Sequence, residues 1–344
     1  MQRNDGWTTS LVFRRKGVLK ALVTGATGFI GSHLVEALVH QGAQVRCLVR
    51  NTSQLGWIKD LPVEFVVGDC REKASLQQAV QDVEQVYHLA GATMAVREQT
   101  FFEVNGLGTR NLVEVCIENK TPLNKFLYLS SQAAAGPCLN RGRKNESDPC
   151  TPVSPYGDSK LQAEEVALSH AHEIPLLVLR PCAVYGPRDK GFFALVQCLS
   201  RGINPCFCRH DQYISLCAVE DLVRAILLAA ATPTVSGEVF FISDGHDYRM
   251  AEIADIFAQA MGRRPLKLRL PPQLLFGLAL CAEGCARVTG KPSMMSRGKL
   301  REIRCTNWLC DSAKAGALLG FEPRIALARG AASTVAWYKK EQWL

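Results

Sequence analysis

Long apolar runs are absent from this sequence of 344 residues. A membrane-spanning helix needs about 20 consecutive apolar residues, and the longest approach is LLFGLALC at residues 274–281. A secretory signal peptide needs a shorter apolar core near the N-terminus, and residues 1–17 contain none. We therefore expect a cytoplasmic protein, with residues 1–17 forming a flexible N-terminal extension.

Residues 274–281 leave two interpretations open. An apolar stretch of this length is typical of a helix buried in a core or in the wall of a pocket, and we favour that interpretation. A helix that lies in the membrane interface would have a similar sequence. Contact with a membrane surface therefore stays an alternative.

Histidine is scarce, with seven residues against 14 cysteines. No histidine lies at ligand spacing from the cysteine pairs Cys206/Cys208 and Cys281/Cys285, so the pattern of a zinc site is missing. We predict no bound metal. In a chain without a signal peptide, we expect the cysteines to be reduced and mostly buried.

Aromatic residues are not interleaved with the basic ones. The net charge is +8, but the lysines and arginines are scattered along the chain. This pattern argues against nucleic acid as a partner. The mild positive charge suits an anionic small molecule, and a solvated basic surface explains it equally well.

The most informative feature that is present is a glycine-rich turn between a predicted strand at 19–23 and a predicted helix at 32–39. Gly25 permits a tight turn off the strand, Gly28 lets the backbone approach a pyrophosphate, and Gly31 lets the helix pack closely on the sheet. The helix N-terminus then directs unpaired N–H groups and a positive dipole end at the phosphates. This turn predicts that the chain binds a nucleotide cofactor.

Strand and helix patterns alternate through the first two thirds of the chain, which predicts an α/β fold with a doubly wound parallel sheet of the Rossmann type. Residues 130–155, rich in turn-forming residues, are expected to cross the carboxyl edge of the sheet, where ligands of such folds bind. The further strands are predicted at 45–49, 64–67, 85–90, 125–130 and 176–180, and the helices at 76–83, 102–119 and 156–171.

Beyond residue 187 the alternation becomes irregular, so we predict a smaller second lobe that covers the substrate. We assign 18–187 to the dinucleotide-binding domain, with 214–243 rejoining it, and mainly 188–213 and 244–344 to the substrate lobe. In this part we predict helices at 191–201, 220–231 and 250–261 and strands at 215–219 and 238–242.

The segment TGATGFIG at 24–31 resembles the TGxxGxxG signature of the extended branch of the short-chain dehydrogenase/reductase superfamily, which includes the NAD-dependent epimerase/dehydratase family. Tyr156 and Lys160 resemble the catalytic Tyr-x-x-x-Lys of that family, and Ser131 lies 25 residues before Tyr156, as in the extended branch. The matches occur in the family order across 18–187. The others are Asp69, His88 to Gly91, Asn105, Gly108, Thr109, Arg180, Pro181 and Tyr185 to Pro187.

Tyr156 and Lys160 lie four residues apart and therefore on one face of a helix, whose start is marked by Ser154 as N-cap and Pro155 in the first turn. A phenol has a pKa near 10, and a nearby ammonium group lowers it by stabilising the phenolate. We expect Tyr156 to act as general acid or base on a substrate oxygen. Ser131 is expected to hold the same oxygen in line.

Two neighbours belong to this predicted site. Ser130 replaces Ser131 if the register is shifted by one residue. The resemblance implies that Asn105 organises the backbone of the active site rather than reacts. It also implies that Lys160 contacts the nicotinamide ribose.

The end of the second strand selects the cofactor in such folds, because an acidic residue there binds the 2′-hydroxyl of NAD and an arginine accommodates a 2′-phosphate. Residues 46–51 read RCLVRN, with Arg50 and no acid at that position, which favours NADP(H). NAD(H) stays an alternative, since Arg50 could stack on the adenine instead. Together with the resemblance, the predicted cofactor-binding residues are Gly25, Thr27, Gly28, Phe29, Ile30, Gly31, Arg50, Asp69 near the adenine, Cys70, Leu89, Ala90, Gly91, Lys160, Pro181 and Val184.

The residues directly after Ser131 narrow the choice of reaction. Dehydratases of this branch resemble one another in having two acidic residues directly after the catalytic Ser or Thr, whereas this chain has Gln132 and an alanine there. Epimerases that retain NAD usually show the missing acid of the second strand. RCLVRN and the apolar second lobe are more similar to 3β-hydroxysteroid dehydrogenases and dihydroflavonol-type reductases, with Phe192, Phe193 and 274–281 as candidate pocket walls.

The prediction is therefore an NADP(H)-preferring oxidoreductase that interconverts a secondary alcohol and a ketone on a bulky, largely apolar small molecule. Two alternatives stay open: a nucleotide-sugar epimerase with tightly bound NAD, and a non-catalytic nucleotide-sensing protein. The resemblance also implies a homodimer formed through a helix bundle that includes the Tyr156 helix.

Overall fold

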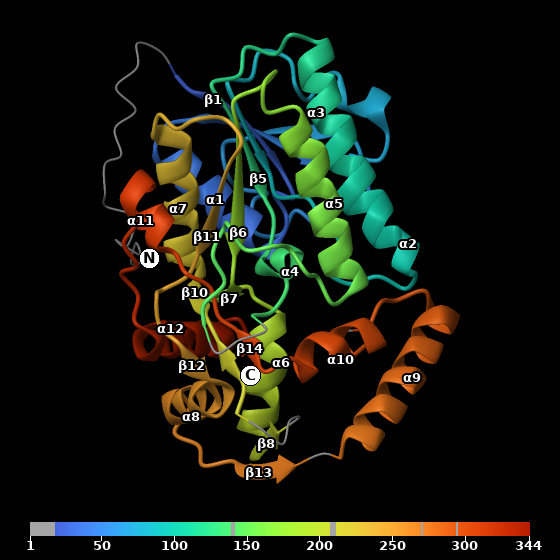
Figure 1. Cartoon of the computed structure of the whole chain (residues 1–344), viewed down its shortest axis with the longest axis vertical. Coiled ribbons are helices and arrows are strands. Elements are labelled where there is room, and N and C mark those ends of the chain that lie inside the picture. The colour runs from blue at the N-terminus through green and yellow to red at the C-terminus, as the bar shows by residue number, and fades with distance from the viewer. Residues whose placement is uncertain (1–17, 139–141, 207–210, 270, 294) are drawn as a thin grey trace.

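The computed structural model describes residues 18–344 except 139–141, 207–210, 270 and 294. Its centre is a sheet of seven parallel strands in the order β11-β6-β5-β4-β1-β2-β3 (Figure 1). The predicted doubly wound fold is confirmed, and the predicted strands agree with the observed ones within about two residues. The strands are β1 (Lys20–Thr24), β2 (Gln44–Val49), β3 (Glu64–Val67), β4 (Gln85–His88), β5 (Lys125–Leu129), β6 (Leu176–Pro181) and β11 (Glu238–Ile242).

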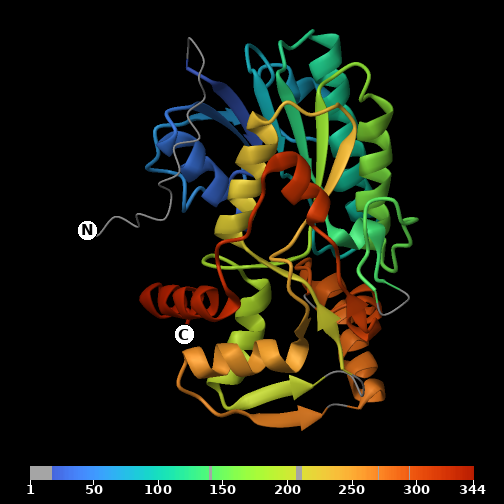
Figure 2. The same ribbon diagram turned by 60° about the vertical axis from the view of Figure 1, so that its left-hand side comes forward.

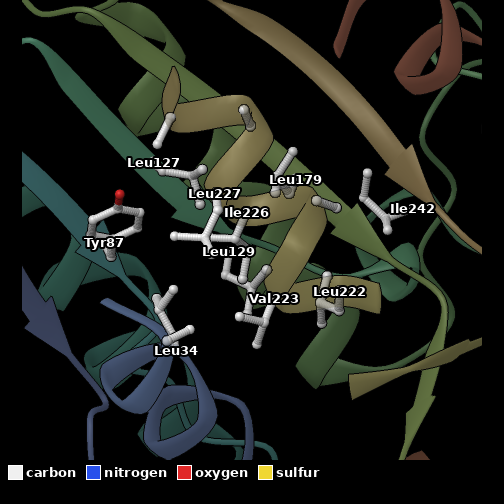
Figure 3. Close-up of a cluster of buried hydrophobic side chains, with 14 of the residues drawn as sticks. Leu34, Tyr87, Leu127, Leu129, Leu179, Leu222, Val223, Ile226, Leu227 and Ile242 are labelled. Carbon is white, nitrogen blue, oxygen red and sulfur yellow. The ribbon is translucent and has the colours of Figure 1, made fainter. Parts of the chain in front are cut away.

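Helices cover both faces of this sheet, which explains why β5 and β6 are buried along their whole length and read as apolar runs. On one face, Leu222 and Ile226 recur at helical spacing and meet Leu129, Leu179 and Leu34 (Figure 3). Helices α1 (Phe29–His40), α7 (Val219–Ala231) and α11 (Ala313–Leu319) cover this face. The other face is covered by η2 (Lys73–Leu76), α3 (Gly108–Glu118) and α5 (Pro155–Ser169).

Two predicted helices of this half differ from the structure. The prediction of a helix at 76–83 is wrong: after η2 the chain continues in turns. Asp82 has a φ of +56°, outside the range of a right-handed helix, and Arg46 Nη1 donates to the carbonyl oxygens of residues 78, 79 and 81 in these turns. The helix predicted at 102–119 is interrupted at its start by a π-helical turn. It runs as α2 (Glu98–Phe101), η3 (Phe102–Leu107) and α3.

A second lobe lies beyond the carboxyl ends of the sheet strands (Figure 2). Its core joins Tyr185, Phe257 and Tyr338. The remaining elements are α4 (Gln132–Ala135), β7 (Ala183–Tyr185), α6 (Gly191–Ser200), β8 (Ile203–Cys206), β9 (Tyr213–Ile214), β10 (Leu216–Ala218), β12 (Tyr248–Arg249), α8 (Met250–Ala260), β13 (Leu266–Arg269), α9 (Pro272–Thr289), α10 (Arg297–Arg304), β14 (Asn307–Trp308) and α12 (Leu327–Lys340).

Helix α9 departs most from expectation. Leu274, Phe276, Leu278 and Leu280 are 50, 51, 46 and 45% exposed, so the interpretation of 274–281 as a core helix is wrong. The helix packs mainly against α10, in a small cluster of its own around Leu275. Within the described residues, no helix is both long enough and apolar enough to cross a membrane.

Candidate active site

A cleft of about 2040 Å³ lies between the carboxyl edge of the sheet and the second lobe. The sheet half contributes the glycine-rich turn after β1, the segments after β2, β4, β5 and β6, and the start of α5. The lobe contributes parts of α6, β8, α8, α9 and α10. This is the edge at which open α/β sheets bind their ligands.

The glycine-rich turn is built so tightly that side chains are excluded from it. Gly25 has a φ of +71°, and a Cβ there would lie 2.7 Å from the backbone of Leu89 and Ala90. A Cβ on Gly31 would lie 2.1 Å from the carbonyl oxygen of Gly25, so the helix packs directly on the turn. Gly28 is the N-cap of α1, and no side chain caps the helix there. The first N–H groups of α1 are thus left for an anionic group such as a pyrophosphate.

Tyr156 and Ser131 meet at the floor of the cleft. Helix α5 begins as predicted: Ser154 Oγ accepts from the amide of Gly157 at 3.1 Å, and Pro155 occupies the first turn. The Ser131 hydroxyl lies close enough to the Tyr156 phenol to lower its pKa. Ser131 Oγ also accepts from the amide that starts α4, at 3.1 Å, which orients the hydroxyl.

Ser130 and Gln132 flank Ser131 and line the same cleft. Ser130 Oγ and Gln132 Nε2 are buried and have no hydrogen-bond partner among the described residues. A buried polar atom without a partner costs free energy. Both atoms are therefore available to a bound ligand.

The expected effect of Lys160 on Tyr156 is wrong for this state of the site. Burial, opposed by the nearby Ser131 hydroxyl and assisted by the Glu302 carboxylate, raises the pKa of Tyr156 to about 12. Burial also lowers the pKa of Lys160 to about 7. Lys160 Nζ donates to the Leu129 carbonyl oxygen at 2.8 Å and lies 4.3 Å from the centre of the Tyr128 ring. The amine is thus engaged with the sheet rather than with the phenol.

A buried polar network holds the backbone around Lys160. Asn105, in the π-helical turn, accepts from the amide of Ala92 at 2.7 Å and donates to Ser159 Oγ at 2.8 Å. The prediction that Asn105 organises the backbone is confirmed. His88 lies 2.7 Å from Thr24 Oγ1 and 2.9 Å from Thr109 Oγ1, and burial lowers its pKa to about 3. The only sequence signal for the part that His88 takes in this network is its place in a segment that matches the family.

At the adenosine end of the predicted site, some predicted residues border the cleft and others do not. Arg50 lies directly after β2, is exposed and borders the cleft, and its guanidinium forms no ion pair within the described residues. Asp69 binds Arg71 instead, at 2.7 Å, and the Arg71 hydrogen bond lowers the pKa of its carboxyl. Asp69, Cys70 and Ala90 do not border the cleft. The other predicted cofactor residues do: Gly25, Thr27, Gly28, Phe29, Ile30, Gly31, Arg50, Leu89, Gly91, Lys160, Pro181 and Val184.

The lobe supplies two corrections to the predicted pocket wall. Phe192 borders the cleft, but Phe193 packs on Tyr338, 5.2 Å between ring centres. Residues 274–281 do not line the cleft, and α9 reaches it only through Glu283 and Arg287. The sequence does not show which side of α9 borders the cleft, because residues 274–281 contain no charged side chain on any side.

Glu302 of α10 is a site residue that sequence reasoning missed. Ser154 Oγ donates to Glu302 Oε1 at 2.5 Å, so a carboxylate of the lobe binds the N-cap of the helix that carries Tyr156. Lys299 Nζ lies 2.8 Å from the other oxygen. No motif marks this residue, which is separated from Ser154 by 148 positions.

The fold, the glycine turn and the Tyr156–Ser131–Lys160 arrangement define an NAD(P)-dependent oxidoreductase of the extended short-chain dehydrogenase/reductase type. The model of the NAD dependent epimerase/dehydratase family matches residues 21–243. This chain belongs to that family.

Relatives and solved structures resemble the chain over nearly its whole length. It is 31% identical to a ceramide reductase of Caulobacter vibrioides, covering 94% of this chain and 95% of the relative. It is 28% identical to sterol demethylase protein B of Methylococcus capsulatus, with 94% and 99% covered. The UDP-glucuronic acid 4-epimerase from Bacillus cereus, solved with UDP-glucuronic acid and NAD, matches with a TM-score of 0.77 and 25% identity over 94% of this chain and 100% of that chain.

Proposed function

We propose that this enzyme is an NADP(H)-preferring oxidoreductase that interconverts a secondary alcohol and a ketone on a bulky, largely apolar substrate. The observation that carries the proposal is that Tyr156, Ser131 and Lys160 line one cleft with the glycine turn, with the Ser131 hydroxyl close enough to influence the Tyr156 phenol. A hydroxyl pair of this kind can hold one substrate oxygen and exchange a proton with it.

The nicotinamide, when bound, supplies or accepts the hydride. Tyr156 donates its phenolic proton to the carbonyl oxygen during reduction and takes it back from the hydroxyl during oxidation. With a pKa near 12, the phenol is protonated at neutral pH, which suits the reducing direction. Ser131 donates to the same oxygen, and Gln132 Nε2, buried without a partner among the described residues, offers a further donor to the substrate.

Cofactor preference is assigned to Arg50. The residues present fit a dinucleotide, because the N-cap glycine leaves the N–H groups of α1 uncapped and the turn has no room for side chains. Arg50 stands at the cleft end of β2, with no acidic residue beside it in the sequence to bind a 2′-hydroxyl. A guanidinium there can form charge-assisted hydrogen bonds with a 2′-phosphate.

The substrate class is inferred from the cleft and from two relatives. Part of the cleft wall in the lobe is apolar and suits a hydrocarbon body, with Phe192, Leu195, Ile214, Met250 and Trp308, and another part is charged, with Lys267, Arg269, Arg287, Arg297 and Lys299 among its residues. The relatives named ceramide reductase and sterol demethylase protein B point to large lipids as the substrates of similar chains. A long-chain or fused-ring ketone fits both observations.

The test is NADPH consumption by the purified chain with long-chain ketones, fused-ring ketones and, for contrast, UDP-sugars. We expect turnover with one class of ketone, and a loss of about 10²–10⁴-fold in Tyr156→Phe with NADPH binding unchanged. Ser131→Ala should lose more turnover than the matched Ser130→Ala.

The contrary outcomes separate the alternatives. Interconversion of UDP-sugars without consumption of NADPH would establish the epimerase, the activity named for the Bacillus cereus structure. Binding of nucleotide without turnover on any substrate, and no difference between wild type and Tyr156→Phe, would leave a nucleotide-sensing protein.

A further inference from the structure

Helix α9 turns an uncharged surface to solvent. Residues 272–282 contain no charged side chain, and Leu274, Phe276, Leu278 and Leu280 are all exposed. The helix is packed through Leu275 against α10, with Leu274 and Leu278 on one flank of this contact and Phe276 and Leu280 on the other. Single exposed leucines are ordinary, but four large apolar side chains exposed within two turns, about 10 Å of helix, mark an interaction surface.

The strand before α9 extends this surface. In β13, Lys267 and Arg269 border the cleft, and the alternating residues Leu266 and Leu268 are both exposed. Because side chains alternate along a strand, Leu266 and Leu268 point away from the cleft. Figures 1 and 2 show β13 at the end of the lobe farthest from the sheet and α9 running from there along the side of the lobe towards α10. We call Leu266, Leu268 and the exposed face of α9 the apolar tip.

The apolar tip lies within the most basic part of the chain. Residues 263–304 contain ten lysines and arginines and two glutamates, a net charge of +8 that equals the charge of the whole protein. All ten basic side chains are exposed. Within the described part of the chain, three of them form ion pairs, namely Lys267, Arg297 and Lys299, and the other seven form none: Arg263, Arg264, Arg269, Arg287, Lys291, Arg301 and Arg304.

Exposed apolar side chains in a strongly basic segment are complementary to an anionic lipid surface. Leucine and phenylalanine enter the boundary between headgroups and acyl chains, and lysine and arginine bind the phosphates. A second copy of the chain fits less well, because a twofold contact through the apolar tip would set this basic segment against itself.

We propose that the apolar tip docks the enzyme on the surface of an anionic phospholipid bilayer. Glu283 and Arg287 of α9 border the cleft, about one and two turns beyond Leu280 on the same side of the helix as Phe276 and Leu280. Docking therefore brings the cleft next to the bilayer, where a lipid substrate would be dissolved. The docking rests on the exposed face and its charge and does not depend on which reaction the cleft performs.

The test is flotation of the full chain with vesicles of phosphatidylcholine and of phosphatidylcholine mixed with phosphatidylglycerol. We expect binding to the mixed vesicles at least about tenfold stronger than to the neutral ones, and weaker at high salt. Leu274→Gln/Leu278→Gln should lower the binding by about tenfold or more. Arg263→Gln/Arg264→Gln should lower it on mixed vesicles only.

Matched controls make the same kinds of substitution elsewhere on the molecule. Leu318 of α11 and Val235 are as exposed as the α9 leucines or more so, and they belong to the sheet half. Leu318→Gln/Val235→Gln should bind vesicles like wild type, as should Lys339→Gln/Lys340→Gln of α12. Circular dichroism should be unchanged in every variant, since all these side chains are exposed.

Three results would overturn the proposal. The first is a wild-type chain that stays unbound to mixed vesicles at low salt. The second is equal binding by wild type and Leu274→Gln/Leu278→Gln. The third is a concentration-dependent dimer that the same double variant abolishes, which would assign the apolar tip to a second copy.

Discussion

The sheet half and the α9–α10 unit both contain leucine but expose it differently. In the sheet half, large side chains such as Leu22, Leu34 and Phe126 are fully buried between strands and helices. In α9, most of the leucines are about half exposed, and one small cluster holds the helix to α10. The first region is stabilised by its own packing and holds the parts shared by the family. The second is shaped for contact with something outside the chain.

The largest expected effect compares leucines of the two regions. Leu34→Ala in α1 should lower the free energy of unfolding by about 2–5 kcal/mol, because it leaves a cavity in a packed core. Leu278→Ala in α9 should change it by less than about 0.5 kcal/mol, because the side chain is half exposed. Urea unfolding of both variants measures the difference, and equal losses would show that α9 is buried in solution.

The next comparison uses glycines inside two helices. Gly31→Ala should destabilise the protein by about 3 kcal/mol or more and abolish nucleotide binding, since the new Cβ would overlap the Gly25 carbonyl oxygen. Gly277→Ala in α9 meets no atom within 4 Å. It should stabilise the helix by about 0.5–1 kcal/mol. Thermal unfolding and nucleotide titration of the two variants test this, and a stable Gly31→Ala that still binds nucleotide would contradict the geometry of the turn.

A third prediction concerns the buried amine of the site. Burial lowers the pKa of Lys160 from 10.5 to about 7, so between these pH values the unfolded chain binds more protons than the folded one. The contribution of Lys160 to the free energy of unfolding therefore rises with pH across that range and is lowest below about pH 7. The advantage of Lys160→Met over wild type should shrink by up to about 4 kcal/mol between pH 6 and 10. Urea unfolding of both proteins at each pH measures this difference in the free energy of unfolding. A difference that does not change with pH would show that Lys160 keeps its proton throughout.

The smallest expected effect links the two regions. The Glu302 carboxylate raises the pKa of Tyr156, so Glu302→Gln should lower that pKa while keeping an acceptor for Ser154. Proton donation by Tyr156 should then decline at a lower pH, by less than about one pH unit. The pH profile of ketone reduction measures the shift. Glu283→Gln, which loses a carboxylate paired with Arg297 instead, is the matched control and should leave the profile in place.

The sequence predicted the sheet half well because its signals are local. Alternating strands and helices, the Gly25–Gly31 turn and the capped start of α5 each depend on neighbouring residues. The failures depend on distant ones. Arg46, from β2, donates to three carbonyl oxygens of the turns that stand where a helix was predicted at 76–83. Glu302 reaches Ser154 across 148 positions, and the exposure of 274–281 depends on how far α9 stands from the rest of the lobe.

The most direct test of the central claim is the nucleotide itself. One sample of the purified protein is denatured to identify any released nicotinamide nucleotide, and a second, native sample is titrated with NADPH and NADH, alongside Arg50→Ala. A reductase that exchanges its cofactor predicts little released nucleotide, NADPH binding at least about tenfold tighter than NADH, and loss of that preference in Arg50→Ala. Stoichiometric release of NAD, or equal affinities for the two nucleotides in the wild type, would contradict the account.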